Sequence, residues 1–487
     1  MSADDLQLLA ILALLLHWVV VIGLSVRVIM RRRPVGILLA WLAIILSVPV
    51  VGVLVYLFVG ENRISGKFVR RARAIEDRYS QWQQALRTRP LASTDESGVD
   101  VQPLASLGET VFGFPLLQGN RLALLTDSDT IFRSLIEDIE RSTSTCHLEF
   151  YIWHPGGLAD EVLDSVIAAA HRGVMCRVMV DAVGSKAFIA SDGPGRLRAA
   201  GVQLGIALPV GVFSSIFSRA DLRNHRKIAV IDGAVAYTGS QNLVDPAHFK
   251  QDAGVGQWVD AMMRIEGPGV ESLGGVFLKD WEVCTGQGLE ALEGSHDVVP
   301  VAVQGEAAIQ VMPSGPVRQP LAILQVLLSV FYMARRELVI TTPYFVPDES
   351  VLTALVTAAQ RGVAVTLVLP EKNDSRLVDY ASRAVFDDLL AAGVRIAAFR
   401  GGLLHTKSIT VDGAFCLFGS VNLDMRSLWL NFEISLLVCD REVTGRVRSL
   451  QAGYIRESQL LDAAEWQRRP FRRRFLENLT HLAAPLL

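Results

Sequence analysis

Two segments of this chain carry the same polar side chains at the same spacing. Each has a histidine, a lysine two positions later, an aspartate five positions after that, and a Gly-Ser-x-Asn sequence. A single His-x-Lys arises by chance, whereas six residue types repeated in one register do not. Because histidine exchanges protons near neutral pH, the pattern indicates histidine-based catalysis with lysine charge beside it. The two sets are His225, Lys227, Asp232, Gly239, Ser240 and Asn242, and His405, Lys407, Asp412, Gly419, Ser420 and Asn422.

The spacing within each set predicts how these side chains are arranged. A histidine and a lysine two positions apart on an extended strand point to the same face. The Asp-Gly pairs at 232–233 and 412–413 lie between β-rich runs, where Asp-Gly is a hairpin signal. Each set is therefore expected to form a strand, a turn and a returning strand that brings Gly-Ser-x-Asn beside the histidine and lysine. In this geometry the aspartates mainly hold the turns.

The elements that position the two sets are also repeated. Apolar β-rich runs alternate with Ala/Leu-rich helical runs, which is typical of an α/β fold. We predict two tandem α/β sandwich domains, over 106–300 and 301–487, with pseudo-twofold symmetry and a site at their seam. The matching segments are 148–153 with 338–344, 169–174 with 358–363, and 199–202 with 391–394.

The N-terminal region is predicted to lie in a membrane. Residues 8–26 and 35–59 are apolar runs, each long enough to cross about 30 Å of hydrocarbon as a helix. The link between them is so short that the helices, about 6–29 and 35–59, must form an antiparallel transmembrane hairpin. A cleaved signal peptide is the alternative, but Asp4 and Asp5 stand where a signal would be basic. The basic residues around the link between the two helices and those after the second helix are nearly equal in number. The positive-inside rule therefore leaves the orientation open.

Three further segments carry predictions. Residues 61–105 are charged and polar, and indicate a juxtamembrane helix followed by a linker around 94–98. Residues 466–487 are basic and then apolar, which suits an anionic membrane surface, where each Lys or Arg contributes about 1 kcal/mol. The alternative is a surface helix whose apolar stripe faces the core. The apolar run 208–217 either admits acyl chains or is buried.

The composition argues against several classes of protein. A formal net charge of −3 over 487 residues does not favour a nucleic-acid-binding protein, for which a basic balance is expected. The mean hydropathy of +0.34 is high for a soluble enzyme, and the excess is concentrated at the N-terminus. The five cysteines are odd in number and lack metal spacing, so neither a metal site nor a disulfide framework is implied.

The duplicated set resembles the HKD signature of the phospholipase D superfamily, whose members cleave and re-form phosphodiesters at a site shared between two halves. The resemblance implies two-step catalysis in which His225 is the nucleophile that forms a phospho-histidine, and His405 is the acid and then the base. Sequence symmetry leaves the reverse assignment open. Lys227 and Lys407 neutralise the nonbridging oxygens, so no metal or other cofactor is expected. The superfamily motif also includes Asp232 and Asp412, and the groups that offer hydrogen bonds to the phosphate are Ser240, Asn242, Ser420 and Asn422.

Each catalytic histidine needs a carboxylate that fixes its tautomer and stabilises its cation. An acidic residue follows each set on a strand-like run, Asp260 after the first and Glu433 after the second. Equivalent residues in similar families hydrogen-bond the histidines, so Asp260 is assigned to His225 and Glu433 to His405. The alternative for both is a surface carboxylate on a strand.

Several features together resemble the family of bacterial cardiolipin synthases with two membrane spans. They are the two apolar runs, the basic segment after them, the phrases at 342–348 and 422–427, and the Pro-Leu-Leu ending. The resemblance covers nearly the whole chain. It implies a multi-pass phosphatidyltransferase of the bacterial inner membrane that transfers a phosphatidyl group between two phosphatidylglycerol molecules, giving cardiolipin and glycerol. No nucleotide is needed, because one phosphodiester replaces another of similar energy.

Three alternatives belong to other classes. A membrane phospholipase D would use water as acceptor and release phosphatidic acid, and the motifs do not distinguish water from a lipid hydroxyl. A silent scaffold that binds anionic lipid is disfavoured by the intact histidine and lysine of both sets. A nuclease is the least favoured alternative, because the chain is expected to be membrane-bound and lacks an overall basic balance. No nucleic-acid partner is therefore expected. The membrane face, the acyl-chain preference, other lipid donors and homo-oligomerisation stay open.

Overall fold

In a computed structural model, the chain forms two compact units. The first comprises Met1–Lys67 with Val210–Leu222, and the second comprises Phe68–Pro209 with Arg223–Leu487. The structure describes residues 3–30, 35–48, 50–60, 66–91, 100–209, 221–288, 300–317 and 319–482. Four predicted features lie wholly or largely outside these ranges: the link at 31–34, the linker at 94–98, the apolar run 208–217 and the Pro-Leu-Leu ending.

The first unit contains three apolar helices, α1 (Ala3–Ile29), α2 (Val35–Ser47) and α3 (Val51–Val59). Among the described residues, α1 is the one helix long and apolar enough to cross a membrane. The three helices share a small core, in which the rings of Trp41 and Tyr56 meet edge to face at 5.3 Å between centroids.

The second apolar run does not form the single helix predicted over 35–59. It is divided into α2 and α3, of 13 and 9 residues. At about 1.5 Å per residue, neither reaches across roughly 30 Å of hydrocarbon. The sequence has a proline at position 49, a residue that lacks the amide hydrogen needed to continue a helix. After it, Val50 has a left-handed φ of 63°.

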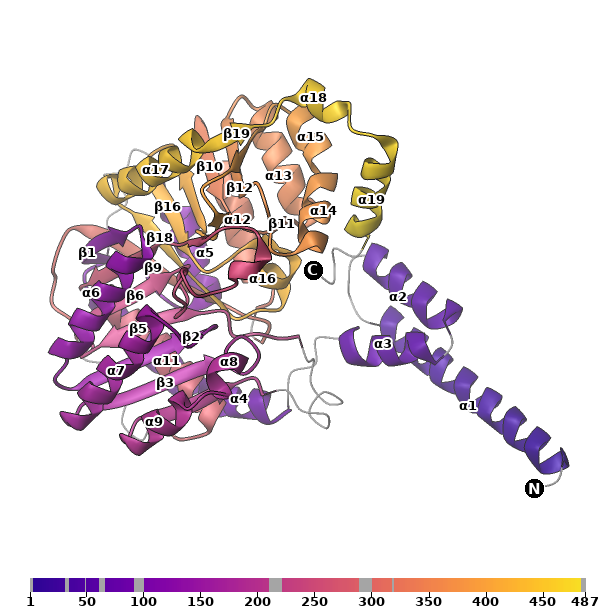
Figure 1. The fold of residues 1–487 in the computed structure, drawn as a ribbon, viewed down its shortest axis with the longest axis horizontal. Helices are drawn as coiled ribbons and strands as arrows, with labels where there is room; N and C mark the ends of the chain where they lie inside the picture. The colour runs from indigo at the N-terminus through magenta and orange to yellow at the C-terminus, as the bar shows by residue number, and fades with distance from the viewer. Residues whose placement is uncertain are drawn as a thin grey trace. The chain divides into compact units, whose positions relative to one another are not determined.

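The second unit is built on one mixed sheet of 15 strands with helices on both faces (Figure 1). The strands of its first half are β1 (Leu117–Leu125), β2 (Thr145–Phe150), β3 (Met175–Asp181), β4 (Gln203–Ala207), β5 (Lys227–Ile231), β6 (Val235–Gly239) and β8 (Met262–Glu266). Those of its second half are β9 (Ala307–Ser314), β10 (Glu337–Thr341), β12 (Ala364–Pro370), β13 (Arg395–Phe399), β15 (Ser408–Val411), β16 (Phe415–Gly419), β18 (Glu433–Cys439) and β19 (Ser458–Leu460).

The strand order has the predicted pseudo-twofold symmetry. The first half runs β1-β8-β6-β5-β2-β3-β4, and the second runs β9-β18-β16-β15-β10-β12-β13, with β19 added at its edge. The halves join through the antiparallel pairing of β1 with β9. Each histidine–lysine pair therefore enters the sheet at the same place in its own half, at the start of β5 or of β15.

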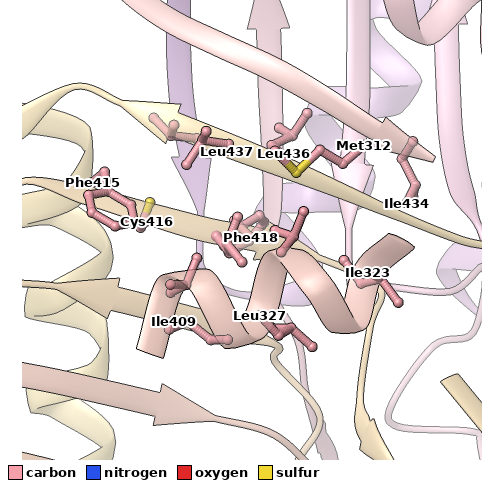
Figure 2. Close-up of a cluster of buried hydrophobic side chains, with 14 of the residues drawn as sticks. Met312, Ile323, Leu327, Ile409, Phe415, Cys416, Phe418, Ile434, Leu436 and Leu437 are labelled. Carbon is pink, nitrogen blue, oxygen red and sulfur yellow. The ribbon is translucent and has the colours of Figure 1, made fainter. Parts of the chain in front are cut away.

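Helices cover both faces because alternate strand residues point to opposite sides. In β5, Ala229 and Ile231 join the core with α6 (Ser128–Arg141) and α7 (Leu158–His171), whereas Ile228 and Val230 join the core with α11 (Gly269–Thr285). The second half repeats this plan with α12 (Ala322–Met333), α13 (Glu349–Gln360) and α17 (Arg441–Arg456). Figure 2 shows Ile323 and Leu327 of α12 beside Ile409 and Phe418 of the sheet.

The segment predicted as a juxtamembrane helix and linker contributes to the α/β body. It contains α4 (Gly66–Ala85) and the start of α5 (Gln102–Phe112). On α4, Tyr79 Oη donates to Glu282 Oε1 of α11 at 3.1 Å, and Trp82 covers Gly275, where a Cβ would lie 1.9 Å from the indole ring. The remaining helices are α8 (Lys186–Ile189), α9 (Gly193–Ala199), α14 (Arg376–Ala384), α15 (Phe386–Ala391), α16 (Met425–Trp429), α18 (Ala463–Gln467) and α19 (Phe471–His481).

Candidate active site

The two histidines lie where a short segment of each half crosses into the other. β7 (Trp258–Val259) runs parallel to β14 (Leu403–Leu404). The amide of His405 continues this pairing by donating to the carbonyl of the second β7 residue at 2.8 Å. In the reciprocal crossing, the amide of His225 donates to the carbonyl of Phe432, also at 2.8 Å. Each crossing places a segment of one half beside the histidine of the other half.

The crossings exchange the carboxylates between the halves. Nδ1 of His225 lies 2.8 Å from Oε2 of Glu433, and Nδ1 of His405 lies 2.6 Å from Oδ1 of Asp260. The predicted pairing within each half is therefore wrong, because both carboxylates lie at the crossing ends of their strands. Both carboxylates are buried, at 0% and 1% exposure, which excludes the alternative of a surface carboxylate. A carboxylate at Nδ1 leaves Nε2 of each ring for chemistry.

The two lysines have matching environments. Nζ of Lys227 donates to the carbonyl of His225, and Nζ of Lys407 donates to the carbonyl of His405, both at 2.6 Å. Desolvation is the largest cause of the lowered pKa of both histidines, and the lysine of the other half adds to it: the charge of Lys407 lowers the pKa of His225, and that of Lys227 lowers the pKa of His405. The four side chains therefore act on one another across the seam, as a shared site requires.

Burial dominates the electrostatics of this site. Desolvation lowers the pKa of His225 and of His405 to about 4, although the paired carboxylates raise it. Desolvation also lowers the pKa of Lys227 to about 8 and that of Lys407 well below its usual value. Burial therefore favours the neutral form of both imidazoles. An anionic phosphodiester between them would raise the pKa of each histidine and lysine, because opposite charge favours the protonated form.

The two cassette aspartates bind backbone amides at the far end of their hairpins. The carboxylate of Asp232 accepts from the amides of residues 143–145 at 2.7–2.8 Å, and that of Asp412 accepts from the amides of residues 335–337 at 2.7–2.9 Å. Both have a left-handed φ, 52° and 54°. Asp232 is about 16 Å along the strand from Lys227, at 3.3 Å per residue. These contacts support a structural role for both aspartates.

The cassette serines hold the strands that carry the carboxylates. Oγ of Ser420 donates to Oε2 of Glu433 at 2.5 Å and accepts from the amide of Ile434 at 2.9 Å. In the first half, Oγ of Ser240 accepts from the amide of Ala261 at 3.1 Å and donates to its carbonyl at 3.2 Å. Direct phosphate binding by these serines stays a prediction.

The cassette asparagines offer polar atoms that the protein itself does not use. Oδ1 of Asn242 accepts from the amide of Ile152 at 3.1 Å. Its Nδ2, and Oδ1 of Asn422, are buried with no hydrogen-bond partner among the described residues. Since buried polar groups are almost always paired, the unpaired Nδ2 of Asn242 supports the predicted contact with a phosphate, whose oxygens accept hydrogen bonds. Oδ1 of Asn422 can only accept a hydrogen bond, so the contact of Asn422 with a phosphate stays a prediction.

Several neighbours of the histidines were not predicted from the sequence. The ring of Tyr151 lies 4.8 Å from that of His225, and the ring of Trp258 lies 4.3 Å from that of His405. Asn431 Nδ2 donates to Oε1 of Glu433 at 3.2 Å. The repeat could not reveal Trp258, because this residue reaches the second histidine from a crossing segment of the first half.

Two further carboxylates also act on the lysines. The charge of Asp181, at the end of β3, raises the pKa of Lys227, and that of Asp424 raises the pKa of Lys407. Burial raises the pKa of Asp424 itself to about 6. Among the residues that the structure describes, no group of three or more His, Cys, Asp or Glu side chains is arranged to hold a metal ion.

Known proteins resemble the chain over almost its whole length. The family described as cardiolipin synthase, PLD-like domain, matches residues 135–261 and 327–451, and the family described as phospholipase D-nuclease N-terminal matches residues 19–61. The chain is 45% identical over 472 residues to cardiolipin synthase A of Serratia proteamaculans (strain 568), covering 97% of each chain. It is 46% identical over 476 residues to cardiolipin synthase A of Cronobacter sakazakii (strain ATCC BAA-894), covering 98% of each.

A solved structure shares the fold. The crystal structure of phosphatidylserine synthase from Haemophilus influenzae Rd KW20 superposes with a TM-score of 0.57 at 14% identity, covering 79% of this chain and 100% of that one. At this identity the likeness concerns the fold alone. Two stretches of the chain match the family model, and the alignments with the curated relatives cover nearly its whole length. The chain therefore belongs to the cardiolipin synthase family of phospholipase D-like proteins.

Proposed function

We propose that this protein is a phosphatidyltransferase that joins two phosphatidylglycerol molecules into cardiolipin and releases glycerol. The observation that carries the proposal is the seam, where two buried histidines each bind a carboxylate of the other half. Two buried lysines lie beside them. The curated relatives named cardiolipin synthase A support the choice of substrate.

In the first step His225 attacks the phosphorus of one phosphatidylglycerol. Glu433 holds the proton on Nδ1, so the Nε2 lone pair forms the N–P bond. The P–O bond to the headgroup glycerol breaks, and the leaving oxygen takes a proton from Nε2 of His405. Lys227, Lys407 and the amide of Asn242 stabilise the charge that develops on the nonbridging oxygens.

In the second step the roles reverse at His405. The ring removes a proton from the headgroup hydroxyl of a second phosphatidylglycerol, whose oxygen attacks the phosphorus of the phospho-histidine. The P–N bond breaks, which releases His225 and cardiolipin. One phosphodiester has replaced another, so the reaction is reversible and is driven by loss of glycerol.

The substrate and the apolar helix α1 support the proposed location. A lipid substrate requires a membrane, and α1 is long and apolar enough to span one. We place the protein in a bacterial inner membrane, with anionic lipid around it. The α2–α3 pair is a second membrane-embedded segment of this proposal.

Product analysis tests the proposal. Purified full-length protein is incubated in phosphatidylglycerol vesicles without metal or nucleotide, and the lipids are measured by mass spectrometry. Cardiolipin with an equal amount of glycerol is expected from the native chain, and neither from the His225→Ala variant. Phosphatidic acid as the only new lipid would make the protein a hydrolase and contradict the proposal.

A further inference from the structure

The C-terminal helix α19 turns its apolar side chains outward. Phe471, Phe475 and Leu479 of α19 are 82%, 54% and 50% exposed, and Leu482, the residue that follows the helix, is 78% exposed. They recur every three or four residues, so they line one side of a helix with 3.6 residues per turn. The rings of the first two are stacked, with centroids 6.3 Å apart. These four residues are called the α19 stripe below.

The opposite side of α19 is fixed to the protein by charged groups. Glu477 is 0% exposed and forms ion pairs with Arg469 and Arg473, both at 3.2 Å. Arg469 also pairs with Asp387 of α15 at 3.0 Å, and its guanidinium lies 3.9 Å above the ring of Trp466. A buried carboxylate with two arginine partners is a specific anchor, because leaving it unpaired would be costly.

This arrangement is the reverse of an ordinary surface helix, which buries its apolar stripe and exposes its charges. It excludes the alternative that the stripe faces the core. The exposed stripe is bordered by exposed arginines, because Arg472 and Arg474 lie on the same helix and Arg468 lies just before it. Apolar side chains flanked by arginines are typical of a helix that lies in the interface of an anionic membrane.

A series of contacts connects this helix to the second histidine of the active site. α19 packs against α14, as Figure 1 shows. Two residues before α14, Asp374 pairs with Nζ of Lys250 at 2.9 Å and accepts from Oη of Tyr344 at 2.9 Å. Lys250 in turn lies 5.4 Å from the ring of Trp258, which contacts His405. A short series of contacts therefore links the α19 helix to the second histidine.

We propose that the α19 stripe inserts into the interface of an anionic bilayer and holds the Lys250–Asp374 edge of the site against the lipid surface. The occupant is lipid because the stripe is bordered by positive charge and because α1 of the same chain is long and apolar enough to cross a membrane. The purpose assigned to this docking, delivery of headgroups to the seam, rests on the proposed function. The docking itself does not.

A fluorescence experiment tests the docking without using activity. Leu479→Cys in the full-length chain is labelled with an environment-sensitive fluorophore and reconstituted into phosphatidylglycerol/phosphatidylcholine vesicles that contain nitroxide-labelled lipid. The matched control is Glu442→Cys on α17, whose side chain is 76% exposed. Labelling of the unsubstituted chain corrects for the native cysteines. We expect at least about threefold stronger quenching at position 479 than at 442.

Two outcomes of this experiment would overturn the docking. Equal quenching at both positions would mean that the stripe does not meet lipid. Energy transfer between labels at 479 on different copies, without lipid quenching, would make the stripe an interface between copies of this chain.

A kinetic experiment tests the purpose of the docking. The triple variant Phe471→Ser/Phe475→Ser/Leu479→Ser is compared with the native chain on vesicles of low phosphatidylglycerol content and on dissolved short-chain phosphatidylglycerol. We expect about tenfold slower turnover on vesicles and a change within about twofold on the dissolved substrate. Equal rates on vesicles, or equal losses on both substrates, would contradict the proposal. If the native chain makes no cardiolipin at all, the proposed function fails, while the quenching result still decides the docking.

Discussion

The two halves of the site carry the same cassette but surround its histidine differently. His225 lies against Tyr151, and its carboxylate Glu433 is also held by Ser420 and Asn431. His405 lies against Trp258, and its carboxylate is the shorter Asp260. The backbone around the two histidines is repeated, whereas the side chains that contact them are not.

The residue between histidine and lysine shows the same contrast. In the first half it is Arg226, which forms an ion pair with Asp280 and donates to the carbonyl of Glu433 at 3.0 Å. In the second half it is Thr406, whose hydroxyl lies 3.1 Å from Oη of Tyr454. Duplication supplies two equal positions, but a nucleophile and a proton donor have unequal tasks. The side chains around each histidine that are not repeated allow the two halves to act differently. Four experiments test how alike the halves are.

The largest effect is expected from removing either histidine. His225→Ala and His405→Ala should each lower turnover of phosphatidylglycerol by about 10⁴-fold or more, because each removes a reacting group. A phosphatidyl ester of p-nitrophenol separates the roles, because this leaving group needs no acid. With it, His405→Ala should retain a burst of p-nitrophenol in stopped flow, and His225→Ala should show none.

The opposite burst pattern would exchange the roles of the two histidines, and normal turnover in either variant would refute the shared site. The control is His171→Ala, which changes an exposed histidine on α7.

The lysines should matter next, and about equally. Lys227→Met and Lys407→Met should each reduce kcat by roughly 10²- to 10³-fold, since each removes a charge aimed at the transferred phosphoryl group. Steady-state rates on phosphatidylglycerol vesicles measure the loss, with exposed Lys186→Met as the control. A native rate would remove that lysine from the site, and a large difference between the two would show that the halves share the charge unequally.

Neutralising the carboxylates should separate the halves by pH. Glu433 raises the pKa of His225, and Asp260 raises that of His405, so Glu433→Gln and Asp260→Asn should lower the pKa of the ring that each contacts. A lower pKa keeps the nucleophile His225 neutral in more acidic solution. Glu433→Gln should therefore move the acid limb of the pH profile of the p-nitrophenol burst to lower pH. A lower pKa also makes the proton donor lose its proton earlier, so Asp260→Asn moves the alkaline limb of steady-state turnover downward.

Each pKa unit corresponds to tenfold in rate on the affected limb, so shifts of about one unit are readily measured. If Glu433→Gln moved the alkaline limb and Asp260→Asn the acid limb, the crossed assignment would fail.

The smallest effect on rate is expected at the cassette aspartates. Asp232→Asn and Asp412→Asn should lower the free energy of unfolding by about 1–3 kcal/mol, because hydrogen bonds from three backbone amides lose their charged acceptor. The pKa of Asp232 is lowered because bonds from the Thr145, Thr143 and Ser144 amides outweigh burial. Thermal unfolding and kcat per folded molecule measure the two effects, with exposed Asp129→Asn as the control. A stable but inactive Asp232→Asn protein would contradict the structural role.

Much of the fold followed from local patterns in the chain. Strand period, Asp-Gly turns and the repeated segments predicted an α/β pair with pseudo-twofold symmetry, and the matched strand orders confirm it. Local patterns suffice here because a strand or turn is specified by neighbours a few residues away. The identity of the cassette residues was readable for the same reason, since their spacing is a property of one hairpin.

The length of an apolar run did not determine the helix that it forms. The run at 35–59 predicted one span, and the structure divides it after Ser47. Composition reports the average polarity of a segment, whereas a single proline removes a backbone donor and changes the path of the chain.

The chain by itself determined the chemistry: two histidines, two lysines and two carboxylates, on strands of a duplicated fold. Tertiary structure alone decided which carboxylate holds which histidine, because β7 and residue Phe432 cross the seam and no distance along the chain records a crossing. It also decided that the α19 stripe faces outward, because Arg469 pairs with Glu477 and Asp387 and so holds the opposite side of the helix against the protein. A helical pattern specifies two faces, and only the packed partners determine which one meets the protein.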